Sequence, residues 1–96
     1  MKWEVDLGNG VEKKVAKLPQ TIRDILNDLI TDLITKGPIQ PEWPNFSQLN
    51  KGKKIAAYHC HLKKGKPTFV ACWWVVDKKI KLMEINYVGT HENAPH

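Results

Sequence analysis

The apolar positions near the N-terminus change from a spacing of two to a helical spacing. Trp3, Val5 and Leu7 alternate with charged residues, which predicts a short strand with one buried face. Gly8-Asn9-Gly10 interrupts this pattern. Apolar residues then recur at helical intervals from residue 11 to residue 18, with lysines between them. These residues therefore predict a strand followed by a short first helix.

A second helix is the clearest element of the pattern. Pro19 suits its start, because the backbone donor that proline lacks would stay unpaired there, and Gly37-Pro38 suits its end. Polar residues occupy most of the remaining positions. We expect the helix to cover one side of a sheet with a continuous apolar stripe, made of Ile22, Ile25, Leu26, Leu29, Ile30, Leu33 and Ile34.

The second half of the chain predicts an irregular segment and then a meander. Prolines divide residues 37–54, where we expect Trp43, Phe46 and Leu49 to hold the chain against the body of the protein. Two short turns, at 63–67 and 77–79, then separate three strands, and turns this short imply antiparallel pairing. We expect the nearly continuous apolar strand to be central. The strands are 55–62, 68–76 and 80–88.

This order of elements predicts a single α+β domain over residues 1–96. An N-terminal strand and two helices would pack with an antiparallel sheet that ends in a three-stranded meander, with both helices on one face. Side chains alternate between the two faces of a strand. Cys60 and Leu62 should therefore meet the helices, while His59 and His61 should lie on the open face.

The same alternation applies to the other two strands of the meander. Trp73 and Trp74 are neighbours and should face opposite sides, so that one is core and the other lies on the open face. On the last strand we expect Glu84 and Asn86 on the open face, and an apolar set on the helix side made of Met83, Ile85 and Tyr87.

Composition and charge narrow the class of protein. Hydrophobic residues make up 42% of the chain and charged residues 26%, as in globular domains. A net charge of +5 favours polyanionic partners. No apolar run approaches the roughly 18 residues of a membrane span, and acidic residues in the alternating N-terminus argue against a signal peptide. We therefore expect a cytoplasmic protein without a membrane partner. Cys60 and Cys72 should be free thiols, although neighbouring positions across a hairpin would allow a disulfide on oxidation.

The histidines and a lysine-rich turn carry the candidate chemistry. His59 and His61 precede Lys63-Lys64-Gly65-Lys66, and His91 and His96 lie in the tail. Imidazoles exchange protons near neutral pH, and lysines add fixed positive charge, so the set suits proton transfer around a phosphate. Two other interpretations remain open. The residues are merely solvated, or His59, His61 and His91 bind zinc.

The order of these parts resembles the RelE/ParE superfamily of bacterial toxins, and more closely its RelE branch. The resemblance covers most of the chain and rests on Val11–Pro19, Ile22–Lys36, Tyr58–Leu62, the lysine turn and Tyr87–Glu92. It implies a RelE-like toxin of a type II toxin–antitoxin pair. Such a toxin inhibits translation by cleaving mRNA in the ribosomal A site without a metal or other cofactor, and a cognate antitoxin neutralises it.

The resemblance also implies roles for individual residues. His59 and His61 occupy positions where members often carry lysines, and one of them would act as the base. His91 follows the glycine of the last strand, where a basic residue is common, and would act as the acid. His96 lies about where members place a base-stacking aromatic. The phosphate would be bound and stabilised by Lys66 together with Lys63 or Lys64.

Two non-catalytic functions are the alternatives. ParE-like toxins of the same superfamily act by binding alone, and a basic domain of this size is also able to bind structured RNA without cutting it. The imidazole and lysine content of the open face favours the nuclease, because acid–base catalysis needs such groups.

Overall fold

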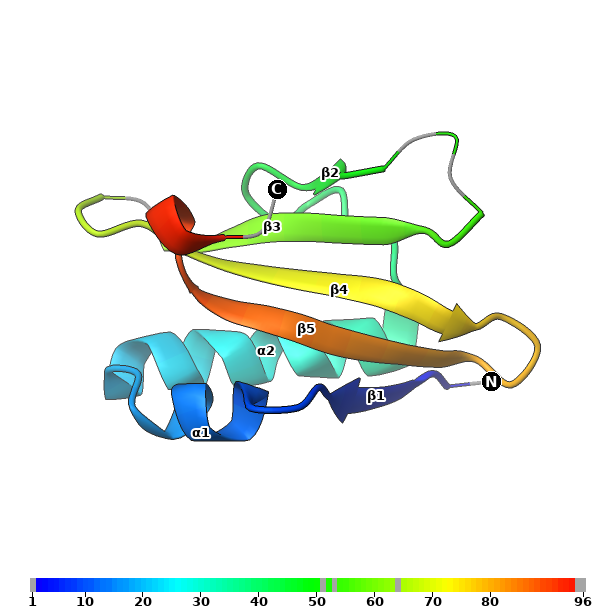
Figure 1. Cartoon of the computed structure of the whole chain (residues 1–96), viewed down its shortest axis with the longest axis horizontal. Coiled ribbons are helices and arrows are strands. Elements are labelled where there is room, and N and C mark those ends of the chain that lie inside the picture. The colour runs from blue at the N-terminus through cyan, green and yellow to red at the C-terminus, as the bar shows by residue number, and fades with distance from the viewer. Residues whose placement is uncertain (1, 51, 53, 64, 95–96) are drawn as a thin grey trace.

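A computed structural model describes residues 2–50, 52, 54–63 and 65–94 of the protein. Within these residues the chain forms five strands, two α-helices and one 3-10 helix (Figure 1). The predicted strand, two helices and three-stranded meander occur in the expected order, and β2 and η1 are additional. The elements are β1 (Glu4–Leu7), α1 (Val11–Ala16), α2 (Gln20–Lys36), β2 (Ser47–Gln48), β3 (Ala57–Lys63), β4 (Phe69–Asp77), β5 (Leu82–Thr90) and η1 (His91–Asn93).

The strands form one sheet in the order β1-β5-β4-β3-β2. The meander β3–β4–β5 is antiparallel, and β4 occupies the central position that its apolar run predicts. β1 runs parallel to β5. The two-residue β2 pairs antiparallel with the outer side of β3, inside a segment whose sequence suggests no regular structure. Figure 1 shows both helices on the same side of the sheet.

The main core lies between α2 and the sheet. Ile22, Leu26, Leu29 and Leu33 are at most 1% exposed, so the predicted stripe of α2 is the helix face that packs inward. Tyr58, Cys60 and Leu62 of β3 and Trp73 of β4 meet it from the sheet. Burial of each such side chain stabilises the fold by roughly 1.5–3 kcal/mol, before the conformational entropy lost on folding is subtracted. Packing against α2 therefore fixes which face of each strand points inward.

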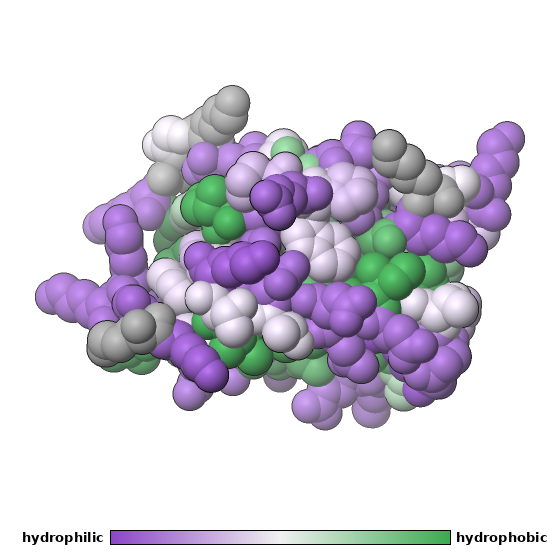
Figure 2. All heavy atoms as spheres, turned by 180° about the vertical axis from the view of Figure 1, so that it is seen from behind, coloured by the Kyte–Doolittle hydropathy of each residue, from purple (hydrophilic) through white to green (hydrophobic). Residues whose placement is uncertain are grey.

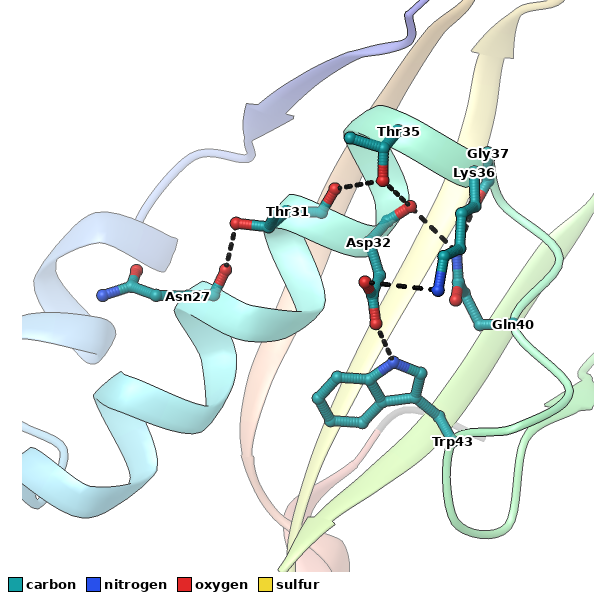
Figure 3. Close-up of polar contacts among 8 residues, drawn as sticks. All are labelled: Asn27, Thr31, Asp32, Thr35, Lys36, Gly37, Gln40 and Trp43. Carbon is teal, nitrogen blue, oxygen red and sulfur yellow. Dashed lines mark hydrogen bonds and ion pairs between the residues drawn. The ribbon is translucent and has the colours of Figure 1, made fainter.

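The irregular segment after α2 is tied back to the helix (Figure 3). The Trp43 indole N–H donates to the carboxylate of Asp32 at 2.9 Å, and Lys36 forms an ion pair with the same carboxylate. The buried Gln40 amide donates to the carbonyls of Asp32 and Gly37. Phe46 then stacks on Tyr58, with ring centroids 5.6 Å apart. The anchoring role expected of Trp43 and Phe46 is confirmed, and it places β2 against β3.

A β-bulge in β5 reverses the predicted direction of one aromatic residue. Cys72 pairs with Tyr87 and Trp73 with Ile85, so Asn86 is an extra residue that no residue of β4 faces. Strand alternation restarts after such a bulge. Ile85 stays in the main core, but Tyr87 lies on the open face with Cys72 and Val70. The prediction that Tyr87 belongs to the helix side was therefore wrong.

Smaller differences concern element ends and the cysteines. α1 ends at Ala16 rather than at residue 18, and β5 begins at Leu82 and continues to Thr90. Cys60 contacts the helix-side core, whereas Cys72 lies in the open-face cluster. Both are free thiols. Because they point to opposite faces of the sheet, the fold keeps them from forming the disulfide considered as an alternative.

The face of the molecule seen in Figure 2 is mostly hydrophilic. Figure 2 shows the molecule from behind, where apolar side chains gather only in small separate patches. The large apolar side chains that are most exposed are Ile39, Ile55, Val76 and Ile80. In the described part of the chain, no helix combines the length and the apolar character that a membrane span requires.

Candidate active site

The two histidines of β3 lie on the sheet face that the helices leave open. In the register of the sheet, His59 faces Cys72 and His61 faces Val70, and both of these β4 residues belong to the open-face cluster. Cys60, between them, belongs to the core. The rings of His59 and His61 meet edge to face, with centroids 5.9 Å apart. The predicted placement of this pair is confirmed.

The chain after β5 brings a third imidazole to the same place. The backbone N–H of His91 donates to the carbonyl of Thr68 at 2.8 Å, which fixes the start of η1 beside the turn between β3 and β4. The His91 ring meets His61 edge to face, with centroids 5.3 Å apart. Residues thirty positions apart in the sequence are therefore neighbours, with His61 between the other two imidazoles.

His61 and His91 line an open groove of about 830 Å³. Exposed Lys66 and Gly65 also line it, and the Thr68 hydroxyl donates to the Gly65 carbonyl at 2.6 Å, which holds this part of the lining. Two histidines and a lysine thus line one open space. The full lining is His61, Gly65, Lys66, Pro67, Thr68, Thr90, His91 and Glu92.

His59 differs from the other two histidines in its surroundings. His59 is only 9% exposed, and it does not line the groove. Its Nδ1 lies 3.0 Å from the hydroxyl of Ser47, the residue that pairs with it across β2 and β3. His59 therefore lies on the predicted face but is buried there, because β2 covers it.

The open face also carries an apolar floor that the sequence does not reveal. Val70, Cys72 and Tyr87 are buried there beneath Leu49 and Ala94. The Tyr87 hydroxyl donates to the Thr90 carbonyl at 2.7 Å. The Lys14 ammonium of α1 lies over the Tyr87 ring, 5.3 Å from its centroid. This floor supports the strand that leads into His91.

Further along the same face, Trp74 and Glu84 form a polar pair. The indole N–H donates to the carboxylate at 3.1 Å. Trp73 is the core member of the tryptophan pair and is fully buried, so the predicted division between the two residues is confirmed. Trp74 extends the open face away from the groove.

The remaining candidate residues are less closely placed. Lys63 is exposed at the end of β3 and is not part of the groove lining. Lys64 and His96 lie outside the described residues. Among the residues that are described, no three His, Cys, Asp or Glu side chains are arranged to hold a metal ion, so the zinc interpretation of His59, His61 and His91 gains no support from the geometry.

Sequence reasoning missed Ser47 and Lys14 as parts of this face. Ser47 lies in a proline-divided segment that the sequence predicts to be a loop. Its importance comes from its position opposite His59, and only the pairing of β2 with β3 reveals that position. Lys14 reads as one of several solvated lysines on a short helix. Its position over Tyr87 depends on the bulge in β5.

Comparisons with known proteins identify the fold. No protein-family model matches the sequence, and no curated protein matches it. The archaeal RelE–RelB complex from Pyrococcus horikoshii OT3 contains a similar chain, with a TM-score of 0.78 and 16% identity over 98% of this chain and 100% of that one. A mutant of E. coli toxin RelE in the free state has a TM-score of 0.71 and 18% identity over 98% of this chain and 88% of that one. The predicted RelE-like α+β fold is therefore confirmed.

Proposed function

We propose that the protein is the toxin of a type II toxin–antitoxin pair and that it inhibits translation by cleaving mRNA in the ribosomal A site. One observation supports the catalytic part most directly. Two imidazoles and a lysine, on a RelE-like fold, line the same groove on the open face of the sheet. A domain that acts by binding alone has no need for this arrangement.

The groove suits cleavage of RNA by its own 2′-hydroxyl. In this reaction the 2′ oxygen attacks the adjacent phosphorus and the bond from phosphorus to the 5′ oxygen breaks, which leaves a 2′,3′-cyclic phosphate and a 5′-hydroxyl. His61 takes the 2′ proton as the base, and His91 donates a proton to the departing 5′ oxygen as the acid. The two rings are neighbours, and acid–base groups of this kind each contribute roughly 10²–10⁴-fold to the rate.

The lysines supply the electrostatic part of the mechanism. Charge develops on the phosphoryl oxygens as the new bond forms, and a cation directed at them stabilises the transition state more than the ground state. Lys66 is exposed and lines the same groove as the two imidazoles. Lys63, exposed at the end of β3, adds positive charge before the turn that carries Lys66. By sequence, Lys64 belongs to the same lysine-rich segment.

The proposed partners are the ribosome with its mRNA, and an antitoxin. The archaeal structure with the same fold is a complex with RelB. A net charge of +5 favours both the RNA and an acidic segment of an antitoxin. Such a system operates in the cytoplasm, where translation takes place.

Replacement of the groove residues tests the mechanism. In an assay with translating ribosomes, His61→Ala and His91→Ala should each lower the cleavage rate by roughly 10²-fold or more. Cleavage should persist when zinc is removed by a chelator that leaves the Mg²⁺ of the ribosomes in place, and the pH–rate profile should be bell-shaped, with one limb lost in His91→Ala. Mapping of the RNA ends should find a 5′-hydroxyl at the cut.

A lysine pair provides the matched control. Lys66→Ala should slow cleavage because it removes charge from the groove, whereas Lys79→Ala removes the same charge from the exposed turn between β4 and β5 and should have little effect. Wild-type cleavage by a folded variant with His59, His61 and His91 all changed to Ala would contradict the mechanism. A folded wild-type protein that arrests growth without cutting mRNA would favour toxicity by binding alone.

A further inference from the structure

We propose that Ser47 and His59 form a positioning pair, in which the serine fixes the tautomer of His59 and His59 in turn fixes the orientation of the His61 ring. The role assigned to His61 rests on the proposed nuclease function. The coupling between the three side chains does not, and it can be measured in the protein alone. His59 then acts through His61 rather than on the RNA.

Burial separates the two neighbouring histidines of β3. His61 is half-buried and lines the groove, so a phosphate in the groove is able to reach its ring. His59 is 9% exposed, lies outside the groove lining and is covered on one side by β2. A general base must come within hydrogen-bonding reach of the proton that it removes. His61 meets this requirement, and the covered His59 is suited to support it.

The position of Ser47 is built by several contacts. Its register partner across the sheet is His59, which places the two side chains on the same face. The segment before it is held by the hydrogen bond from Trp43 to Asp32 and by the N–H of His61, which donates to the Pro44 carbonyl at 2.8 Å. Ser47 itself is exposed, so its hydroxyl is not needed to fill a core. The distance of 3.0 Å to Nδ1 gives this hydroxyl a specific partner.

A serine hydroxyl is able to donate to Nδ1 or to accept from it. In the proposed pair the Ser47 hydroxyl is the donor, which places the ring proton of a neutral His59 on Nε2. On the other side of His59, the residue that faces it from β4 is Cys72, a buried thiol that burial keeps neutral by raising its pKa to about 11. His59 therefore has a hydroxyl on one side, an uncharged thiol on another, and the edge-to-face contact with His61 at 5.9 Å.

The contacts then continue from His59 to the groove. His59 meets His61 at an interplanar angle of 62°, and His61 meets His91 at 70°. Rings packed edge to face restrict each other's rotation, and an acid–base group works best when its productive orientation is fixed before the substrate arrives. A serine at the outer side of the sheet is thus linked to the reacting imidazoles through one buried ring.

NMR of the histidine ring nitrogens tests the coupling in the free protein. In the wild type, His59 should show the shifts of a single Nε2–H tautomer. Ser47→Ala should convert His59 to a mixture of tautomers and shift the ring signals of His61, while Ser47→Thr, which keeps the hydroxyl, should restore the wild-type spectrum. Gln48→Ala is the control, because it changes the other residue of the same strand, which pairs with Tyr58.

The cleavage assay tests the consequence for His61. Ser47→Ala should lower kcat about three- to tenfold, the size of one lost neutral hydrogen bond, with KM unchanged. Ser47→Thr should recover the rate. An unchanged His59 tautomer in Ser47→Ala, or altered His59 signals without any change at His61, would overturn the positioning pair. If the wild type does not cleave mRNA at all, the proposed nuclease function fails, and the NMR result still decides whether the pair exists.

Discussion

At the scale of single residues, the two cysteines show how burial on opposite faces of one sheet sets chemical behaviour. Cys60 is fully buried in the main core and Cys72 is 2% exposed in the open-face cluster. Burial raises the pKa of Cys60 to about 12 and that of Cys72 to about 11, from an ordinary value of 9.0. The thiolate is the reactive form of cysteine. Both residues are therefore neutral near pH 7 and should react slowly with thiol reagents.

These pKa values predict a loss of stability at alkaline pH. The unfolded chain releases its thiol protons near pH 9, whereas the folded protein retains them up to about pH 11–12. The stabilising contribution is thus present below pH 9 and is lost as the pH rises above it, at about 1 kcal/mol per thiol and pH unit. Urea unfolding of the wild type between pH 8 and 10.5 should show this slope, and the Cys60→Ala/Cys72→Ala variant should show a shallower one. Equal slopes would contradict the assignment.

At the scale of elements, the sequence determines the regular parts well and the irregular parts poorly. α2 and the meander strands follow from periodicity, because each carries a long apolar pattern that only one packing arrangement buries. Periodicity does not predict the bulge in β5. Met83, Ile85 and Tyr87 keep an unbroken period of two, and Tyr87 is as well buried on the open face as it would be in the core.

The candidate site divides in the same way. Strand alternation places His61 on the open face, but no local pattern places His91 beside it, because that contact depends on where β5 ends and η1 begins. The resemblance to RelE suggested the proximity, and the geometry now supports it. The sequence does not predict the role of Ser47, because a strand of two residues is too short to show an alternating pattern.

The end of β5 offers a test of its own packing. A Cβ at Gly89 would lie 2.7 Å from the Tyr87 hydroxyl oxygen, which is held by its bond to the Thr90 carbonyl. Gly89→Ala should therefore destabilise the protein by about 1–3 kcal/mol. Tyr87→Phe removes the clashing oxygen and its hydrogen bond, at a cost of about 1 kcal/mol. In thermal or urea unfolding, the double variant should lose less stability than the sum of the two single variants. Strict additivity would show that the two residues do not compete for this space.

At the scale of the whole molecule, the groove and the exposed apolar side chains of Val76 and Ile80 lie at opposite ends. Figure 1 shows η1 and the β3–β4 turn at one end and the β4–β5 turn at the other. Val76 and Ile80 are 39% and 68% exposed at the second end. Val76 and Ile55 line a hollow there, between Lys54 and Lys78. An amphipathic acidic segment of an antitoxin matches this combination of apolar surface and positive charge.

Growth assays test whether the proposed antitoxin binds at this hollow. Expression of the protein alone should arrest growth, and co-expression of its antitoxin should relieve the arrest. Val76→Glu should keep the toxicity but weaken relief by the antitoxin, because it places an acid in an apolar, positively flanked hollow. Ile39→Glu is the matched control, since Ile39 is similarly exposed at 53% but lies outside that hollow. Full relief of Val76→Glu would place the antitoxin elsewhere, and a harmless, folded wild type would contradict the toxin function itself.

The short β2 also affects the tendency of the protein to self-associate. An exposed strand border with free N–H and C=O groups recruits other chains and promotes aggregation. Here the segment from Pro44 to Leu49 occupies the border of β3, through the β2 pairing and bonds of 2.8 Å from His61 to Pro44 and from Leu49 to Ala57. At the opposite border, β1 is short and carries Glu4 and Asp6, both exposed. These short or charged borders offer another chain little continuous backbone to pair with, so the free protein should remain monodisperse in light scattering at concentrations where an uncapped sheet would form fibres.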